Sequence, residues 1–202
     1  MLDVSVQVTH GTPVWEALTA IGTLGAVLVA LFGPMLRAWW RSPSLEITYE
    51  PQEPYCRDTV LEPGNVRAHW VRVKVTNEGR GTAKRCKGKM NAVFRPDGGL
   101  RDDRDPMQLR WAGVPLEQSL EPLDLARRDS QFLTVVFARD DSREGAWIAA
   151  DIRARPGFPY MLEAGQTHRV RLAVYADNAD PVTKDFVITY GGDIRSLEMR
   201  LA

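Results

Sequence analysis

The chain has 202 residues and carries 26 basic and 26 acidic side chains, so its formal net charge at pH 7 is zero. Such a balance gives no general attraction to phosphate backbones, and we expect no double-stranded nucleic acid as a partner. Its two cysteines are too few for a scaffold built on disulfides and do not form a CxxC pair. They are compatible with free thiols in a reducing compartment.

An apolar run near the N-terminus dominates the sequence. Residues 17–36 (ALTAIGTLGAVLVALFGPML) contain no charged side chain. At about 1.5 Å per residue, a helix of this length spans about 30 Å, the thickness of a bilayer's hydrocarbon core. No basic residue precedes the run and no small-residue cleavage site follows it, which favours an anchor over a secretory signal. The sequence predicts a transmembrane helix over residues 15–41 and a short external segment over residues 1–14.

Aromatic and basic residues flank this run. Trp15 precedes it, and Arg37, Trp39, Trp40 and Arg41 follow it. Indole rings and arginines suit the headgroup region, so we expect these five residues at the membrane interfaces. Both arginines lie on the C-terminal side. The positive-inside rule therefore predicts a single-pass protein of the cell inner membrane, with an external N-terminus and a cytoplasmic C-terminal domain.

Small residues recur along the apolar run. Gly22, Ala26 and Ala30 are spaced by four, which places them near one face of a helix. In lipid such faces let helices approach closely, so we expect a homo-oligomer or contact with another membrane protein. The alternative is the ordinary abundance of Gly and Ala in membrane helices. No ionisable side chain lies in the run, so a single helix offers no ion path.

Alternating apolar and polar residues mark the rest of the chain, residues 44–202. Gly, Pro, Asn and Asp separate the alternating segments, and the pattern predicts a mainly β, antiparallel sandwich. Two insertions, near residues 100–128 and 140–159, are longer than ordinary hairpin loops. The C-terminal tail fits either a strand or a short helix. The expected strands cover residues 45–50, 71–76, 86–94, 132–137, 169–174 and 185–190, and the fourth is apolar enough for burial on both faces.

A basic cluster is the strongest chemical feature of this part. Arg85, Lys87 and Lys89 alternate and would share one face of a strand, and Arg72 and Lys74 would lie beside them if the two strands form a hairpin. Such a face suits lipid headgroups, a nucleotide or RNA. The alternative is a solvated outer face that prevents aggregation. The predicted anion-binding set is Arg72, Lys74, Arg80, Lys84, Arg85, Lys87 and Lys89.

No catalytic motif is present. Metalloprotease, zinc, phosphate-loop, nucleophile-elbow and dinucleotide signatures are all missing, and we expect no enzyme, no metal site and no cofactor. A reactive thiol would need a nearby base, so we interpret Cys56 as a loop thiol and Cys86 as a core residue. Trp70, Trp111 and Trp147 would either line a ligand groove or pack in the core.

Two segments resemble a known class of domain. Residues 71–90 (VRVKVTNEGRGTAKRCKGKM) resemble the first hairpin of CARDB-like and other bacterial immunoglobulin-like domains, and residues 163–190 resemble the closing hairpin. The layout is also similar to bacterial single-pass membrane proteins that carry such a domain. The resemblance implies an immunoglobulin-like β-sandwich and no particular activity, and the two insertions depart from a minimal sandwich.

These patterns favour a membrane-tethered cytoplasmic binding or sensor module without enzymatic activity. We expect it to recognise a protein or an anionic ligand near the inner leaflet, through the insertions and the basic strand pair. Its expected partners are the bilayer, a second copy or another membrane protein, and a nucleotide or other anion. The alternative is a ligand-gated effector of the bacterial antiviral type, which would oligomerise through its helix and perturb the membrane.

Overall fold

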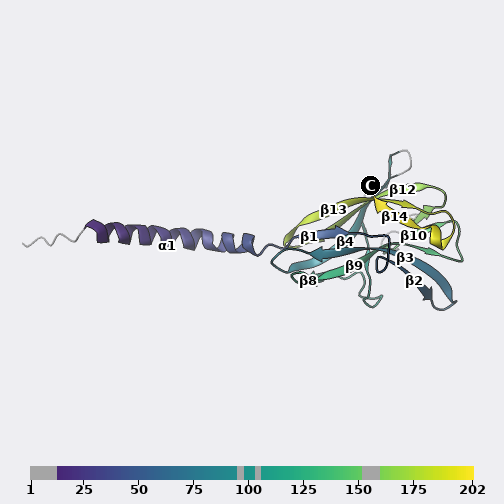
Figure 1. The fold of residues 1–202 in the computed structure, drawn as a ribbon, viewed down its shortest axis with the longest axis horizontal. Coiled ribbons are helices and arrows are strands. Elements are labelled where there is room, and N and C mark those ends of the chain that lie inside the picture. Colours follow the sequence, from purple (N-terminus) through teal and green to yellow (C-terminus); the bar gives the residue numbers. More distant parts are fainter. Residues whose placement is uncertain (1–12, 95–97, 103–105, 152–159) are drawn as a thin grey trace, which may run out of the picture. The chain divides into compact units, whose positions relative to one another are not determined.

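The computed structural model describes residues 13–94, 98–102, 106–151 and 160–202. The chain divides into two compact units, Met1–Arg41 and Ser42–Ala202. Figure 1 shows the first as a helix and the second as a body of strands.

The helix α1 (Pro13–Trp40) makes up the described part of the first unit. Proline suits the first helical position because its missing N–H would lack a partner there, and Glu16 complements the positive end of the helix dipole. The stretch Val14–Met35 is long and apolar enough to cross a membrane, and none of it is buried. The predicted apolar helix is therefore present, and its apolar stretch Val14–Met35 is not buried in the described chain.

The second unit is built from two antiparallel sheets, which we call sheet 1 and sheet 2. Sheet 1 has seven strands in the order β1-β3-β9-β10-β11, with β2 also paired to β3 and β7 to β9. Its strands are β1 (Leu45–Thr48), β2 (Cys56–Leu61), β3 (Val66–Asn77), β7 (Arg110–Trp111), β9 (Ser130–Arg139), β10 (Gly145–Ile148) and β11 (Met161–Glu163).

Sheet 2 also has seven strands, in the order β14-β13-β12-β4-β5, with β6 and β8 paired to β4. A short 3-10 helix, η1 (Ile194–Ser196), precedes the last strand, so the C-terminal tail contains both elements that its sequence allowed. The strands are β4 (Ala83–Phe94), β5 (Leu100–Asp102), β6 (Met107–Gln108), β8 (Leu123–Leu125), β12 (Thr167–Ala176), β13 (Ala179–Thr189) and β14 (Glu198–Leu201).

Alternation along the strands sends one set of side chains into the core between the sheets. On β3, Val71, Val73 and Val75 are fully buried, and the residues between them face outward. The core strand β9 is buried on both faces at its centre, where Thr134 and Val135 are both inaccessible or nearly so. The predicted mainly β sandwich is confirmed, and each of the six expected strands overlaps an observed one.

The two sheets approach each other closely at Gly88 on β4. A Cβ atom placed there would lie 2.2 Å from Cδ2 of Leu133 on β9 of the opposite sheet. Because any side chain would displace a buried leucine, only glycine fits the two sheets at this spacing.

A buried asparagine fixes the start of the domain. Asn77 is fully buried, and its side-chain oxygen accepts hydrogen bonds from the N–H groups of Ser44 (3.2 Å) and Gly79 (3.0 Å). Its amide group donates to the carbonyl oxygens of Gly81 and Leu125. The side chain thus joins the segment before β1, the turn after β3 and the end of β8, which satisfies polar groups that burial would otherwise leave unpaired.

The hairpin expected over residues 71–90 is wrong. β3 pairs with β1, β2 and β9 in sheet 1, whereas β4 pairs with strands of sheet 2. Both strands turn their apolar residues toward the core, and the turn held by Asn77 carries the chain from one sheet to the other. The closing hairpin is present, because β12 and β13 pair from Thr167↔Thr189 to Ala176↔Ala179.

The first insertion, residues 100–128, is folded against both sheets over its described part. Within it, β6 and β8 pair with β4, whereas β7 pairs with β9. The insertion therefore passes from sheet 2 to sheet 1 and back. The second insertion contributes β10 to sheet 1, and its residues 152–159 lie outside the described chain.

Candidate functional site: a groove lined by tryptophan and arginine

The structure separates the predicted anion-binding residues. Arg72 and Lys74 lie on β3 and face outward from sheet 1, because the valines that alternate with them fill the core. Lys87 and Lys89 lie on β4 and face outward from sheet 2. The two pairs therefore lie on opposite faces of the sandwich and do not form one surface.

Two members of the set, Arg85 and Lys89, contact neighbouring side chains. Arg85 lies 3.2 Å from Asp177, and its backbone adopts a φ of 53° at an irregular position of β4. Lys89 lies over the ring of Tyr175, with Nζ 5.5 Å from the centroid. Lys84 is exposed beside this irregularity, and Arg80 is exposed in the turn between β3 and β4. This face of sheet 2 has the properties of a solvated outer surface.

The small residues of α1 remain uncovered within the chain. Gly22, Ala26 and Ala30 are exposed, and a Cβ atom at Gly22 would meet nothing within 4 Å. Among the predicted interface residues, Trp15, Trp40 and Arg41 are exposed at the two ends of the helix. The side chains of Arg37 and Trp39 lie outside the described residues. Helix association stays a prediction.

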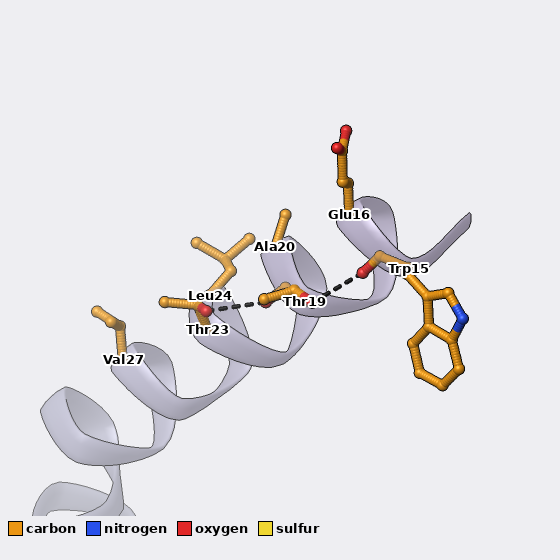
Figure 2. A pocket seen from close by; sticks show the side chains of 7 residues that line it. All are labelled: Trp15, Glu16, Thr19, Ala20, Thr23, Leu24 and Val27. Atoms are coloured by element: carbon orange, nitrogen blue, oxygen red, sulfur yellow. Dashed lines mark hydrogen bonds between the residues drawn. The ribbon is translucent and has the colours of Figure 1, made fainter. Parts of the chain in front are cut away.

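The N-terminal half of α1 presents the surface drawn in Figure 2, where side chains of neighbouring turns project from one helix. The hydroxyls of Thr19 and Thr23 donate to the carbonyl oxygens of Trp15 (2.7 Å) and Thr19 (2.8 Å), so the helix itself satisfies them. A single helix cannot enclose a ligand. Because its two threonine hydroxyls are bonded within the helix, this surface suits lipid or a second helix.

Two adjoining cavities open on the outer face of sheet 1. Their volumes are about 430 and about 250 Å³, and four of their lining residues are shared, so we treat them together as the Trp70 groove. Parts of both insertions line it, including the segment after β7 and the strand β10. The shared residues are Trp70, Arg110, Leu116 and Ala149.

Aromatic rings form the floor of the groove. Trp70 on β3 stacks on Phe137 of β9, with ring centroids 4.5 Å apart and planes inclined by 24°. Trp147 on β10 is the register partner of Phe137 and continues this row across the sheet. The indole N–H of Trp70 donates to Oγ1 of Thr59 (2.6 Å) on β2, which holds the ring in place.

Arginines supply positive charge at the same place. The guanidinium of Arg72 is half-buried, and its Nε is buried without a hydrogen-bond partner. Burial lowers the pKa of Arg72, and the neighbouring charge of Arg57 lowers it further. Arg110 on β7 donates from Nη1 to Oγ of Ser119 (3.0 Å), a neutral acceptor that leaves its charge uncompensated.

Carboxylates are missing beside three of these arginines. Among the described residues, Arg57, Arg72 and Arg110 form no ion pair. By contrast, Arg139 at the far end of the groove bonds to Asp141, with Nε 2.9 Å from Oδ1. Converging unpaired guanidinium groups beside stacked rings can hold an anion attached to a flat ring system.

The indole groups answer the question that the sequence left open. Trp70 and Trp147 are half-buried on the outer face and line the groove, whereas Trp111 contributes to the lining but is itself 2% exposed. The Nε1 atoms of Trp111 and Trp147 are buried without a hydrogen-bond partner. Unpaired buried donors are uncommon in folded proteins, and these two belong to residues that line the same groove as the arginines.

The sequence pointed to part of this groove. Arg72 was in the predicted set and Trp70 and Trp147 were candidates, but Arg57 and Arg110 were missed. The available signal was the Trp-x-Arg alternation of residues 70–72, which places both side chains on one face of a strand. Arg110 follows from no local pattern, because only the pairing of β7 with β9 brings it there.

No protein-family model matches this chain, and no curated protein matches it at a significant level. Within the described part of the chain, no group of three or more His, Cys, Asp or Glu side chains is placed to hold a metal ion. The candidate site therefore depends on the chain's own geometry.

Proposed function

We propose that the chain is a single-pass membrane protein whose β-sandwich binds a small anionic ligand with an aromatic part in the Trp70 groove. The observation that carries this proposal is the half-buried Arg72. Among the described residues it has no carboxylate partner, and its Nε has no hydrogen bond. Withdrawing a guanidinium from water without a partner is costly, and an anionic ligand would supply the missing acceptor.

A nucleoside phosphate is the ligand class that suits the groove best. A nucleobase would stack on the row formed by Trp70, Phe137 and Trp147, and a phosphate would accept from Arg72 and Arg110. The larger of the two cavities, about 430 Å³, has a volume in the range of small-molecule sites, roughly 300–1,000 Å³. Inorganic phosphate alone would leave the aromatic row unused.

The location of the protein is part of the proposal. The apolar stretch Val14–Met35 supports membrane anchoring, and the basic bias of its C-terminal flank favours a domain on the cytoplasmic side of a cell inner membrane. The strand-rich domain is compatible with the proposed relationship to CARDB-like, immunoglobulin-like domains of bacterial membrane proteins. A binding module without enzymatic activity fits this layout.

Binding is tested with adenosine and guanosine 5′-monophosphates and the full chain in detergent micelles. Isothermal titration calorimetry measures affinity, and quenching of tryptophan fluorescence reports on the rings of the groove. We expect binding of either nucleotide to be stronger than that of its nucleoside or of inorganic phosphate. Equal binding of nucleotide and nucleoside would remove the role of the arginines, and no binding of any probe would contradict the nucleotide assignment.

The membrane part is tested separately. Protease digestion of inverted and right-side-out vesicles distinguishes the two orientations, because only an exposed domain is cleaved. We expect the β-sandwich to be digested in inverted vesicles and protected in right-side-out ones. The opposite pattern would place the domain outside the cell, whatever the outcome of the nucleotide titration.

The uncovered face of α1 favours a second candidate function, a ligand-gated effector that oligomerises through its helix and perturbs the membrane. Open space at Gly22 would allow close helix contact along Ala26 and Ala30. Replacing Gly22 and Ala26 with isoleucine would then abolish permeabilisation of cells that express the chain. Unchanged permeabilisation, measured by dye uptake, would exclude this use of the helix.

A further inference from the structure

A thiol, an imidazole and a carboxylate lie together on the hairpin of β2 and β3, on the face opposite to Trp70. Asp58 and His69 are register partners, and Nδ1 of His69 lies 2.6 Å from Oδ1 of Asp58. Cys56 lies two positions before Asp58, and therefore on the same face of β2. The register places Cys56 and His69 diagonally across the two strands on that face, a separation that long side chains can bridge. The order thiol, imidazole, carboxylate is that of a nucleophile, its base and the group that orients the base.

Residues outside the β2–β3 hairpin also lie near the Cys56 thiol. The hydroxyl of Tyr49, directly after β1, lies 3.6 Å from Sγ of Cys56. The backbone of Met199 and the charge of Glu198, both on β14, also act on the pKa of this hydroxyl. A thiolate at Cys56 would thus accept hydrogen bonds from both the phenol and the imidazole.

These contacts favour charge separation between the thiol and the imidazole. Burial raises the pKa of Cys56, but hydrogen bonds from His69 and Tyr49 outweigh it, so that the pKa of the thiol lies below its ordinary value. The hydrogen bond with Cys56 raises the pKa of His69 against burial, and Asp58 raises it further. Both shifts favour the charged pair of thiolate and imidazolium over the neutral pair.

The two cysteines differ in access as well as in charge. Cys56 is partly exposed, and the side chain of Asp58 beside it is 72% exposed, which leaves room for a small reagent. Cys86 is fully buried, its thiol contacts the carbonyl oxygen of Ala83, and burial raises its pKa to about 11. The chain therefore contains an inert thiol that serves as an internal control.

The interpretation of Cys56 as a loop thiol is wrong. Cys56 is the first residue of β2, and the base that its sequence neighbourhood lacked comes from the paired strand. A purely structural role for the cluster, with a neutral thiol packed against a neutral ring, is the alternative. It predicts ordinary thiol reactivity and no dependence on His69 or Asp58.

We propose that Cys56 is a nucleophilic thiol, activated by His69 and positioned through Asp58, that exchanges with low-molecular-weight disulfides to form a mixed disulfide. The Cys56 thiolate attacks one sulfur of the reagent, a new S–S bond forms to Sγ, and the reagent's own S–S bond breaks. The departing sulfur leaves with the electron pair and takes the proton held by the imidazolium. Cys56 is oxidised, the departing sulfur is reduced, and a second thiol reverses the step.

The test uses 4,4′-dithiodipyridine and the full chain in detergent, with Cys86→Ser so that only Cys56 reacts. Absorbance of the released thiopyridone gives the second-order rate from about pH 5 to about pH 9. We expect the midpoint of this profile below the ordinary thiol value of about 8.5. His69→Gln should raise the midpoint and slow the reaction about tenfold near pH 6.5.

Asp58→Asn keeps the test valid if His69→Gln does not fold, because this side chain is exposed. It should slow the reaction, because the imidazole loses the group that orients it. It should move the midpoint less than His69→Gln does, because the charge of Asp58 itself raises the pKa of Cys56. The circular dichroism spectrum should stay unchanged. Cys56→Ser, with Cys86 as the remaining thiol, should react only after unfolding. A midpoint at about 8.5 that neither variant moves would overturn the proposal in favour of the structural role.

Discussion

The two outer faces of the sandwich carry arginines in opposite situations. On sheet 2, Arg169 and Arg171 both bond to Asp185, and both guanidinium groups lie over the ring of Phe94, at 5.2 and 5.6 Å from its centroid. On sheet 1, Arg72 and Arg110 also lie among aromatic residues, but they form no ion pair within the described chain. The two arginines of sheet 2 are thus neutralised by a carboxylate, whereas the two arginines of sheet 1 are not.

Paired arginines are expected to stabilise the fold, whereas unpaired arginines are expected to bind a ligand. A paired guanidinium on a sheet surface holds strands together and needs nothing else. An unpaired and half-buried one costs desolvation free energy that the fold does not recover, and such groups persist where a ligand completes them. We therefore expect substitutions on sheet 1 to change binding and those on sheet 2 to change stability.

The largest effect is expected from Arg72→Met. Methionine keeps the packing of the stem and removes the charge, so affinity for adenosine 5′-monophosphate should fall about 100-fold, or about 2.7 kcal/mol. The free energy of unfolding should stay equal or rise by up to about 1 kcal/mol, because an unpaired charge is removed. Calorimetry and urea unfolding measure the two quantities. Arg171→Met on sheet 2 is the matched control and should leave binding intact; equal losses in both variants would end the distinction between the faces.

Arg110→Met should have the next largest effect. Arg110 also lacks a carboxylate, but Ser119 already accepts one of its hydrogen bonds, so less of its donor capacity is free for a ligand. We expect about a tenfold loss of nucleotide affinity, or about 1.4 kcal/mol. Ser119→Ala should change affinity less than Arg110→Met does. A larger loss in Ser119→Ala would indicate that the loop after β7, and not the guanidinium, holds the ligand.

The sequence predicted the strands because each core strand alternates over several residues. Val71, Val73 and Val75 show this period, and their burial follows directly from it. The segment Cys56–Leu61 was not predicted as a strand because its apolar and polar residues do not alternate regularly. It also lies at the edge of the sheet, where fewer of its side chains are buried. The turn at Pro63 and Gly64, which closes the β2–β3 hairpin, was the signal that would have placed it.

No local sequence pattern predicted the groove or the thiol cluster. Arg72, Arg110 and Trp147 come from three strands that meet only because each pairs with β9. Register between distant strands depends on the whole core, and no window of sequence contains it. The same reason explains why the basic residues of β3 and β4 were expected on one surface: their proximity in sequence concealed a change of sheet.

Asp185→Asn tests the contribution of the paired arginines of sheet 2 to stability. Hydrogen bonds from Arg171 lower the pKa of Asp185 from its ordinary 3.8 to about 2, with burial opposing and Arg169 assisting. A lowered pKa in the folded state means that the stabilisation is present above about pH 4 and is lost as pH falls toward 2. Because both arginines are partly exposed, we expect a loss of about 1 kcal/mol at pH 7.

Urea unfolding at several pH values measures this loss. The difference between the wild-type chain and Asp185→Asn should shrink below pH 4, and nucleotide affinity at pH 7 should be unchanged. A difference that is constant with pH would mean that the carboxylate acts by packing and not by charge. Reduced nucleotide affinity would show that the two faces are coupled.

The smallest effect is expected from the double substitution Lys87→Gln and Lys89→Gln on β4. Lys89 lies over Tyr175, a contact worth roughly 0.5–1 kcal/mol at an exposed site, and Lys87 has no carboxylate partner among the described residues. Stability should therefore change by no more than about 1 kcal/mol, and nucleotide affinity by less than about twofold. Calorimetry decides between the two candidate surfaces of this protein. Loss of affinity here, with Arg72→Met unaffected, would return the anion site to the basic strand of sheet 2 and leave the unpaired arginines of sheet 1 without a ligand.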